Sequence, residues 1–184
     1  MKTMNFISIL FLISHVSFAQ KLPKVLEVRT LTEPIPAGSG GMEVDRLGHI
    51  YMSDFGELLN TAGGTKVYKI SPKGEVEVFA DQLNGASGND IGPDGLFYQS
   101  NVSGNKISII DHSGKVSDFT SNGIYSPVGL VKTPTDLFVA NCGSGTIQRI
   151  SNQGESSVFT KSVLLKCPNG LEMDENGNLY VANF

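Results

Sequence analysis

The chain has 184 residues, with 14 Lys and Arg against 18 Asp and Glu, and its formal net charge is −4. This balance argues against nucleic acid and anionic membranes as partners, because both repel an acidic protein. Gly occurs 21 times and Trp is absent. Beyond the first twenty residues, short alternating runs are separated by Gly, Asn, Asp and Ser, with no sustained 3.6-residue period. This pattern predicts an all-β protein of a single domain.

The first nineteen residues have the pattern of a cleaved secretory signal. Lys2 supplies a positive charge, residues 6–13 (FISILFLI) are almost entirely apolar, and residues 17–19 (SFA) end in small residues. The apolar run is shorter than the about 20 residues that cross a bilayer. No Cys follows it, which argues against a lipid anchor. We therefore expect residues 1–19 to be removed, giving a secreted or periplasmic protein with no membrane span.

A unit of about 40 residues recurs along the rest of the chain. Apolar and aromatic runs that end in Asn or Asp occupy residues 48–54, 96–101, 136–141 and 177–183, and their last residues are 47, 40 and 42 apart. A second series, at residues 66–74, 106–114 and 146–154, repeats every 40 residues, as do Phe79, Phe119 and Phe159. A period near 40 with four short strands per unit is typical of the blades of a β-propeller.

Each unit is expected to contain four antiparallel strands, A to D in chain order. Gly74, Gly114 and Gly154 fall in the predicted turns between strands C and D, where a positive φ favours Gly. Gly95 and Gly177 occupy the corresponding turns between strands A and B.

The repeats predict an incomplete ring. Residues 37–184 contain three whole blades and half of a fourth, whereas propellers close with four to eight blades. We expect the chain to be a fragment of a six-bladed ring; a half-ring that dimerises is the alternative. Residues 20–36 form an N-terminal region in which residues 25–31 (VLEVRTL) alternate. This stretch is expected to be a strand that closes the ring as the outer strand of the last blade.

The topology places the B–C and D–A loops on one face of the ring. The D–A loops are expected to hold residues 38–41, 87–90, 126–129 and 167–170. They should surround the channel mouth, because strand A lines the axis. The B–C loops begin at Asp54, Asn101, Asn141 and Asn183. Function is therefore expected on this face.

Two motifs on this face resemble those of a known family. The sequence NDI at 89–91 precedes PDG at 93–95, and PNGL at 168–171 precedes Asp174 and Gly177. These stretches resemble motifs of the gluconolactonase, senescence-marker-protein and luciferin-regenerating-enzyme propellers. The rhythm of residues 177–183 is also similar to that of NHL-repeat propellers. The resemblance covers residues 37–184 and implies a six-bladed ring with a divalent cation in the channel mouth.

The resemblance implies a hydrolase of a small lactone or ester. Asn89 and Asn169 would be two amide ligands of the cation, which is Ca, Mg, Mn or Zn. The cation would polarise the lactone carbonyl and a carboxylate would activate water. The acid of the first blade should fall within residues 37–41 (AGSGG), which contain none. The catalytic Asp is expected beyond Phe184, so no catalytic residue is assigned within this chain.

Structural roles compete with these assignments. Asn before Gly is favoured in turns, because its side chain bonds to local backbone and tolerates left-handed conformations. Asn89 and Asn169 are therefore either ligands or turn residues. The other polar residues of this face are either ligand contacts or, for those that recur in every blade, turn caps: Asp90, Asp54, Asn101, Asn141 and Asn183.

The missing acid favours a second function, a non-catalytic NHL-like propeller that binds a protein, peptide or glycan on the same face. A ring-opening lyase is a third interpretation. Such sites favour His, whereas His49 and His112 lie in turns without partners at metal or triad spacing.

Two further features lie on the same predicted face. Cys142 and Cys167 are candidate disulfide partners, because secreted proteins retain such bonds. Residues 55–64 make the first B–C connection seven residues longer than its counterpart and form either a lid or a tolerated insertion.

Overall fold

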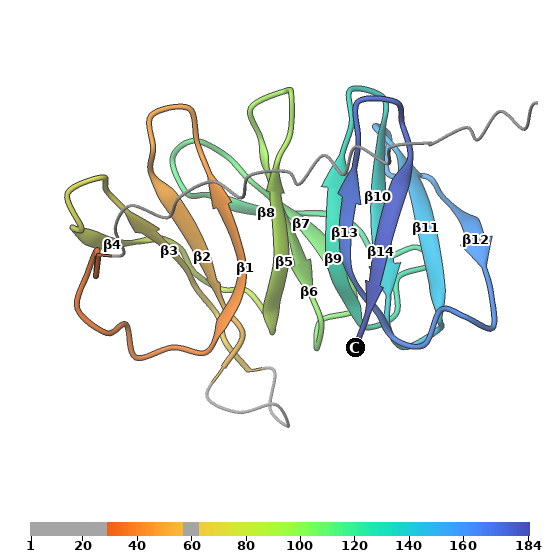
Figure 1. Cartoon of the computed structure of the whole chain (residues 1–184), viewed down its shortest axis with the longest axis horizontal. Coiled ribbons are helices and arrows are strands. Elements are labelled where there is room, and N and C mark those ends of the chain that lie inside the picture. The colour runs from red at the N-terminus through yellow and green to blue at the C-terminus, as the bar shows by residue number, and fades with distance from the viewer. Residues whose placement is uncertain (1–28, 57–62) are drawn as a thin grey trace, which may run out of the picture.

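The computed structural model describes residues 29–56 and 63–184, which form fourteen strands (Figure 1). The expected signal segment and most of the long first B–C connection lie outside the described residues. Across the described ranges, no helix has the length and apolar character needed to traverse a bilayer.

The strands form four antiparallel sheets whose strand order follows the chain. The first sheet contains β1 (Ser39–Val44), β2 (Ile50–Asp54), β3 (Val67–Ile70) and β4 (Val76–Ala80). The second contains β5 (Ala86–Ile91), β6 (Phe97–Asn101), β7 (Lys106–Ile110) and β8 (Val116–Thr120). The third contains β9 (Pro127–Lys132), β10 (Asp136–Asn141), β11 (Thr146–Ser151) and β12 (Ser156–Lys161), and the two-stranded sheet contains β13 (Pro168–Met173) and β14 (Leu179–Asn183). The predicted three and a half blades are confirmed for the described residues.

The first strand of each sheet lies against the first strand of the next. β1 contacts β5, β5 contacts β9, and β9 contacts β13. Figure 1 shows the first three sheets in this order from left to right, with the sheet of β13 and β14 drawn in front of the third. These four inner strands therefore line a common wall, as predicted for strand A.

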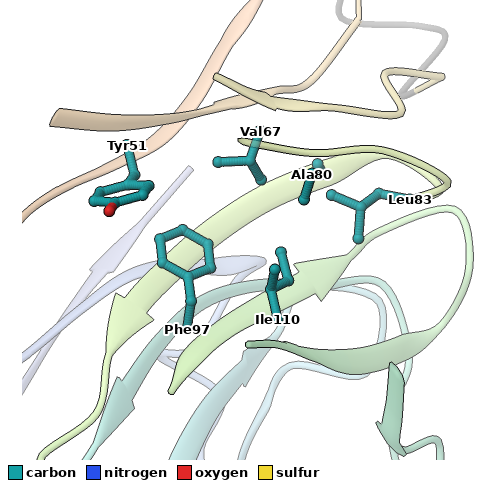
Figure 2. Packing of buried hydrophobic residues seen from close by; sticks show 7 residues of the cluster. Tyr51, Val67, Ala80, Leu83, Phe97 and Ile110 are labelled. Atoms are coloured by element: carbon teal, nitrogen blue, oxygen red, sulfur yellow. The ribbon is translucent and has the colours of Figure 1, made fainter. Parts of the chain in front are cut away.

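The core lies between successive sheets. Between the first two sheets, the ring of Tyr51 lies 4.9 Å from that of Phe79 and 5.5 Å from that of Phe97, and Figure 2 shows Tyr51 facing Phe97 across this interface. The other two phenylalanines of the 40-residue series make equivalent contacts, Phe119 with Tyr98 and Phe159 with Phe138. The series recurs because aromatic pairs of this geometry fill each blade.

The predicted turn glycines have the expected conformation. Gly74, Gly114 and Gly154 have φ values of 87°, 83° and 82° between the third and fourth strands of their sheets. Gly95 and Gly177, between first and second strands, have values of 78° and 81°. The turn chemistry read from the sequence is confirmed at all five positions.

One set of predicted boundaries is wrong. Most residues of the segments 38–41, 87–90, 126–129 and 167–170 belong to the inner strands rather than to loops. Ala86 pairs with Asn101 and Asn89 with Gln99, so a bulge places one extra residue in the inner strand and keeps the segment paired. Residues 29–31, the described part of the expected strand at 25–31, have no strand pairing. Ring closure by this stretch stays a prediction.

Candidate functional site

A pocket of about 540 Å³ opens where the inner strands begin, on the face predicted to carry function. Its wall includes Gly41 from β1, Asn89 from β5, Gly129 from β9 and Asn169 from β13, with Phe55 at its edge. The structure thus brings the two predicted amides into one pocket. No charged side chain of the described residues lines it, which favours a neutral ligand.

Glycines allow the inner strands to meet backbone to backbone along this wall. A Cβ atom added at Gly88 would collide with the carbonyl oxygen of Val128, and one at Gly129 would collide with that of Asn169. At Gly41 the added atom would lie 2.8 Å from the backbone nitrogen of Asn89. Because these positions have no room for a side chain, the wall of the pocket is largely backbone.

Asn89 is held by its amide nitrogen. Its side chain is 9% exposed, and Nδ2 donates hydrogen bonds to the carbonyl oxygen of Gly41 at 2.9 Å and to Ser53 Oγ at 2.6 Å. Its Oδ1 atom is buried and has no hydrogen-bond partner in the part of the chain that the structure describes. An unsatisfied buried acceptor costs about 1–3 kcal/mol, so this atom marks a place where a ligand would lower the free energy.

Asn169 comes from a different strand position. It follows Pro168, which pairs with Asn183, just as Ser87 follows Ala86 in the second sheet. Asn169 therefore corresponds to Ser87 and not to Asn89. It is partly exposed in the pocket wall, whereas Asn89 is almost completely buried there.

Asp90, a predicted contact of this face, does not line the pocket. Its Oδ2 atom accepts a hydrogen bond from the backbone amide of Lys132 at 2.6 Å. Burial raises the pKa of Asp90 to about 6, against the lowering effect of this hydrogen bond, and the carboxylates of Glu43 and Glu172 raise it further. Asp90 therefore joins two inner strands at a position outside the pocket.

The described residues do not fit a divalent cation by themselves. The partnerless Oδ1 of Asn89 is a suitable oxygen ligand, but protein sites for hard cations also use carboxylates. No Asp or Glu of the described residues lines the pocket. Across residues 29–56 and 63–184, no group of three or more His, Cys, Asp and Glu side chains is arranged to hold a metal ion.

The polar residues that end the second strands bond to nearby backbone. Asn101 Oδ1 accepts a hydrogen bond from the backbone amide of Asn84 at 2.9 Å, and Asn141 Oδ1 accepts one from the backbone amide of Tyr125 at 3.2 Å. Asn183 Nδ2 donates a hydrogen bond to the carbonyl oxygen of Leu164 at 2.8 Å. Asp54 accepts a bond from the backbone amide two residues ahead at 2.9 Å. These side chains hold the loops that frame the pocket.

Cys142 and Cys167 are joined by a disulfide and lie in the pocket wall. Cys142 directly follows β10, and Cys167 directly precedes β13. The bond therefore ties the third sheet to the fourth beside the pocket.

The opposite face carries features that sequence reasoning missed. A second pocket of about 740 Å³ lies there, between the first two sheets. His49, for which the sequence showed no partner at metal or triad spacing, lies with Nδ1 2.8 Å from Asp45 Oδ2. In two other turns of this face, Tyr98 bonds to Asp94 and Tyr180 to Asp174. The recurrence of Asp and Tyr at these positions in the sequence could have predicted these contacts, which cap the turns.

No family model and no curated protein sequence matches the chain. Solved structures do match it. A streptogramin B lyase is 21% identical with a TM-score of 0.65, over 82% of this chain and 50% of the lyase chain. A chain of a nidogen/laminin complex is 18% identical with a TM-score of 0.70, over 80% and 57%. A gluconolactonase from Xanthomonas campestris is 20% identical with a TM-score of 0.64, over 79% and 54%.

The fold is a β-propeller. The neighbours include the gluconolactonase-like propellers named from the sequence motifs, so the suspected superfamily resemblance is confirmed for the fold. This chain spans about half the length of these neighbours. At this level of identity the likeness shows architecture, and function has to come from the site.

Proposed function

We propose that this propeller binds a small neutral molecule of the lactone or ester class in the pocket that contains Asn89 and Asn169, called the channel-mouth pocket from here on. The observation that carries the proposal is the buried, partnerless Oδ1 of Asn89 in a wall that also contains Asn169. The lack of charged lining residues in the described part of the pocket supports a neutral ligand. The expected signal at residues 1–19 supports a secreted or periplasmic location.

Hydrolysis of the bound lactone, assisted by a divalent cation, is the catalytic form of this proposal. It requires an anionic ligand and a base, and the described pocket residues provide neither. The gluconolactonase neighbour supports this form by fold alone. Any catalytic acid therefore has to come from outside the described pocket lining, and no hydrolytic step is assigned to Asn89 or Asn169.

Binding and hydrolysis are tested together on the protein after removal of metals with EDTA. Binding of a hydroxylated lactone and of a simple aliphatic lactone is measured by calorimetry, and hydrolysis by pH-stat with and without added Ca, Mg, Mn or Zn. Asn89→Ala and Asn169→Ala are each expected to weaken lactone binding about fivefold or more, as for one lost hydrogen bond. Asn176→Ala, in the exposed turn between β13 and β14 and outside the pocket lining, is the control.

Unchanged binding in both pocket variants would refute the proposal. If the protein binds lactones but does not hydrolyse them with any of the added metals, the binding proposal stands and the hydrolytic proposal is refuted.

A second candidate is a non-catalytic propeller that binds a protein, peptide or glycan on the same face. The apolar side chains of the pocket lining favour it, and among them Met42 is 63% exposed. Exposed apolar surface beside a pocket is typical of macromolecular binding sites. The absence of any lactone binding, together with the retention of peptides or glycans on an array, would support this candidate.

A further inference from the structure

A chain of three buried polar side chains leads into the wall of the channel-mouth pocket. It runs from Gln99 on β6 through Ser53 on β2 to Asn89 on β5. Ser53 and Gln99 are fully buried and Asn89 is 9% exposed. Buried polar groups of this kind have to satisfy one another, so the donor and acceptor roles along the chain can be worked out.

The direction of the chain is set by backbone carbonyls. Gln99 Nε2 lies 3.2, 3.1 and 2.9 Å from the carbonyl oxygens of Ser87, Gly88 and Ser100. Carbonyl oxygens only accept hydrogen bonds, so the NH₂ group of Gln99 has to face them and Oε1 has to face Ser53. The single hydroxyl proton of Ser53 is donated to this Oε1 at 2.6 Å. Ser53 Oγ is then left to accept.

The orientation of the Asn89 amide follows from this. Both of its neighbours, the Gly41 carbonyl and Ser53 Oγ, act as acceptors, so Nδ2 has to face them. A flipped amide would place Oδ1 against two acceptors. Oδ1 is therefore fixed as an acceptor. Among the polar side-chain atoms of Gln99, Ser53 and Asn89, it is the one without a partner in the described residues.

The fold does not require this polar chain. Asn89 pairs with Gln99 across β5 and β6. At the corresponding register of the other sheets the pairs are apolar: Met42 with Met52, Leu130 with Val139, and Leu171 with Val181. Because the same architecture forms with apolar pairs at these positions, the polar pair of the second sheet points to a purpose other than folding.

We infer that Ser53 and Gln99 are positioning residues that fix Asn89 Oδ1 as an obligate acceptor for the bound ligand. This inference rests on the proposed binding function of the pocket and specifies the chemistry at one point of it. The group that meets Oδ1 is an O–H or N–H donor, because the described pocket residues do not fit a cation. A group that only accepts hydrogen bonds, such as a carboxylate or the ester group of a lactone, is rejected at this atom, so a hydroxyl group of the ligand has to meet it. Because Oδ1 is buried, the group that reaches it is compact.

The experiment follows the Asn89 side-chain NH₂ resonances of the ¹⁵N-labelled protein by NMR. Three probes are titrated: calcium chloride as a cation, glycerol as a neutral O–H donor, and sodium acetate as an acceptor-only ion. Glycerol is expected to shift the Asn89 resonances, whereas calcium and acetate are expected to leave them unchanged. The absence of a response to glycerol, or a response to calcium or acetate as large as the response to glycerol, would overturn the inference.

Variants separate positioning from simple packing. Ser53→Ala removes the acceptor for Nδ2 and should weaken binding of the responding probe about fivefold, as for one lost hydrogen bond. Ser53→Thr keeps the hydroxyl and should restore binding. Ser100→Ala is the matched control, because Ser100 is equally buried and its hydroxyl bonds to the carbonyls of Gly88 and Val128 and not to Ser53 or Asn89. Equal losses in Ser53→Ala and Ser100→Ala would contradict a positioning role.

A measurement on the unmodified protein remains decisive if Ser53→Ala does not fold. Both Asn89 side-chain protons should exchange with solvent much more slowly than those of the exposed Asn183. Equally fast exchange would refute the fixed orientation. If glycerol shifts the Asn89 resonances while no lactone binds, the lactone proposal fails and the acceptor site stands.

Discussion

The carboxylate of Asp90 on β5 accepts a hydrogen bond from the backbone amide of Lys132 on β9, at 2.6 Å. This bond joins the inner strands of the second and third sheets. Burial nevertheless raises the pKa of Asp90 to about 6, and the carboxylates of Glu43 and Glu172 add repulsion. The ionised form is thus disfavoured at a junction between two blades.

This arrangement predicts a pH-dependent stability. Since the pKa of Asp90 is raised on folding from 3.8 to about 6, its contribution is fully present below pH ~4 and is lost as the pH rises through ~6. Asp90→Asn keeps an acceptor for Lys132 without the charge. It should raise the free energy of unfolding by up to about 3 kcal/mol at pH 8 and change it little at pH 4. Urea unfolding between pH 4 and 8 measures this, and parallel curves for the two proteins would contradict it.

The inner-strand glycines should not tolerate a methyl group. In Gly129→Ala the new Cβ would collide with the Asn169 carbonyl, and the resulting shift of β9 against β13 should cost about 1–3 kcal/mol. Gly170→Ala is the matched control, because its nearest described neighbour is Ala182 Cβ at 3.6 Å. Thermal unfolding of both variants tests the contrast. Equal melting temperatures would show that the sheets are not in backbone contact.

The buried Asn101 should contribute more to the free energy of unfolding than Asn183, which occupies the same strand position but is exposed. Its Nδ2 atom lies 3.1 Å from Ser108 Oγ, and its Oδ1 accepts the backbone amide of Asn84. Asn101→Ala leaves the buried Ser108 hydroxyl and the Asn84 amide without these partners and should cost about 2 kcal/mol. Asn183→Ala, at the same strand position but exposed, should cost clearly less. Denaturant midpoints that rank the two variants the other way would refute this assignment.

The disulfide should contribute to stability. Cys142 and Cys167 are separated by 25 residues, and closing a loop of that size stabilises a fold by about 3 kcal/mol. Reduction with dithiothreitol should therefore lower the melting temperature. The double variant Cys142→Ser with Cys167→Ser should melt at the reduced temperature and should not respond to the reductant. A reduced protein, verified by mass, that melts like the oxidised one would contradict the prediction.

The periodic features of the fold were readable from the sequence. The phenylalanines at 40-residue spacing fill equivalent aromatic contacts, and Gly74, Gly114 and Gly154 have the positive φ expected of their turns. Such features are local and recur, so each copy supports the assignment of the others. The inner-strand boundaries were misplaced because a bulge keeps the Gly-rich segments paired. A bulge leaves no distinctive pattern in a short sequence stretch.

The candidate site was only partly predictable. Asn89 and Asn169 were named from their motifs, and they do line one pocket. The roles of Ser53 and Gln99 depend on contacts across 36 and 46 residues of sequence, and no local pattern reports such contacts. The partner of His49 lies only four residues away, but the turn that brings them together is visible only in three dimensions.

The glycine contacts between inner strands have a consequence for how this protein changes over evolutionary time. Neighbouring repeats meet through the same kind of joint, formed at Gly88 and again at Gly129. Duplication or deletion of a whole repeat leaves every remaining joint intact, whereas a single residue inserted into an inner strand moves its glycine out of place. Changes in length should therefore accumulate either as whole modules or within connections such as residues 55–64.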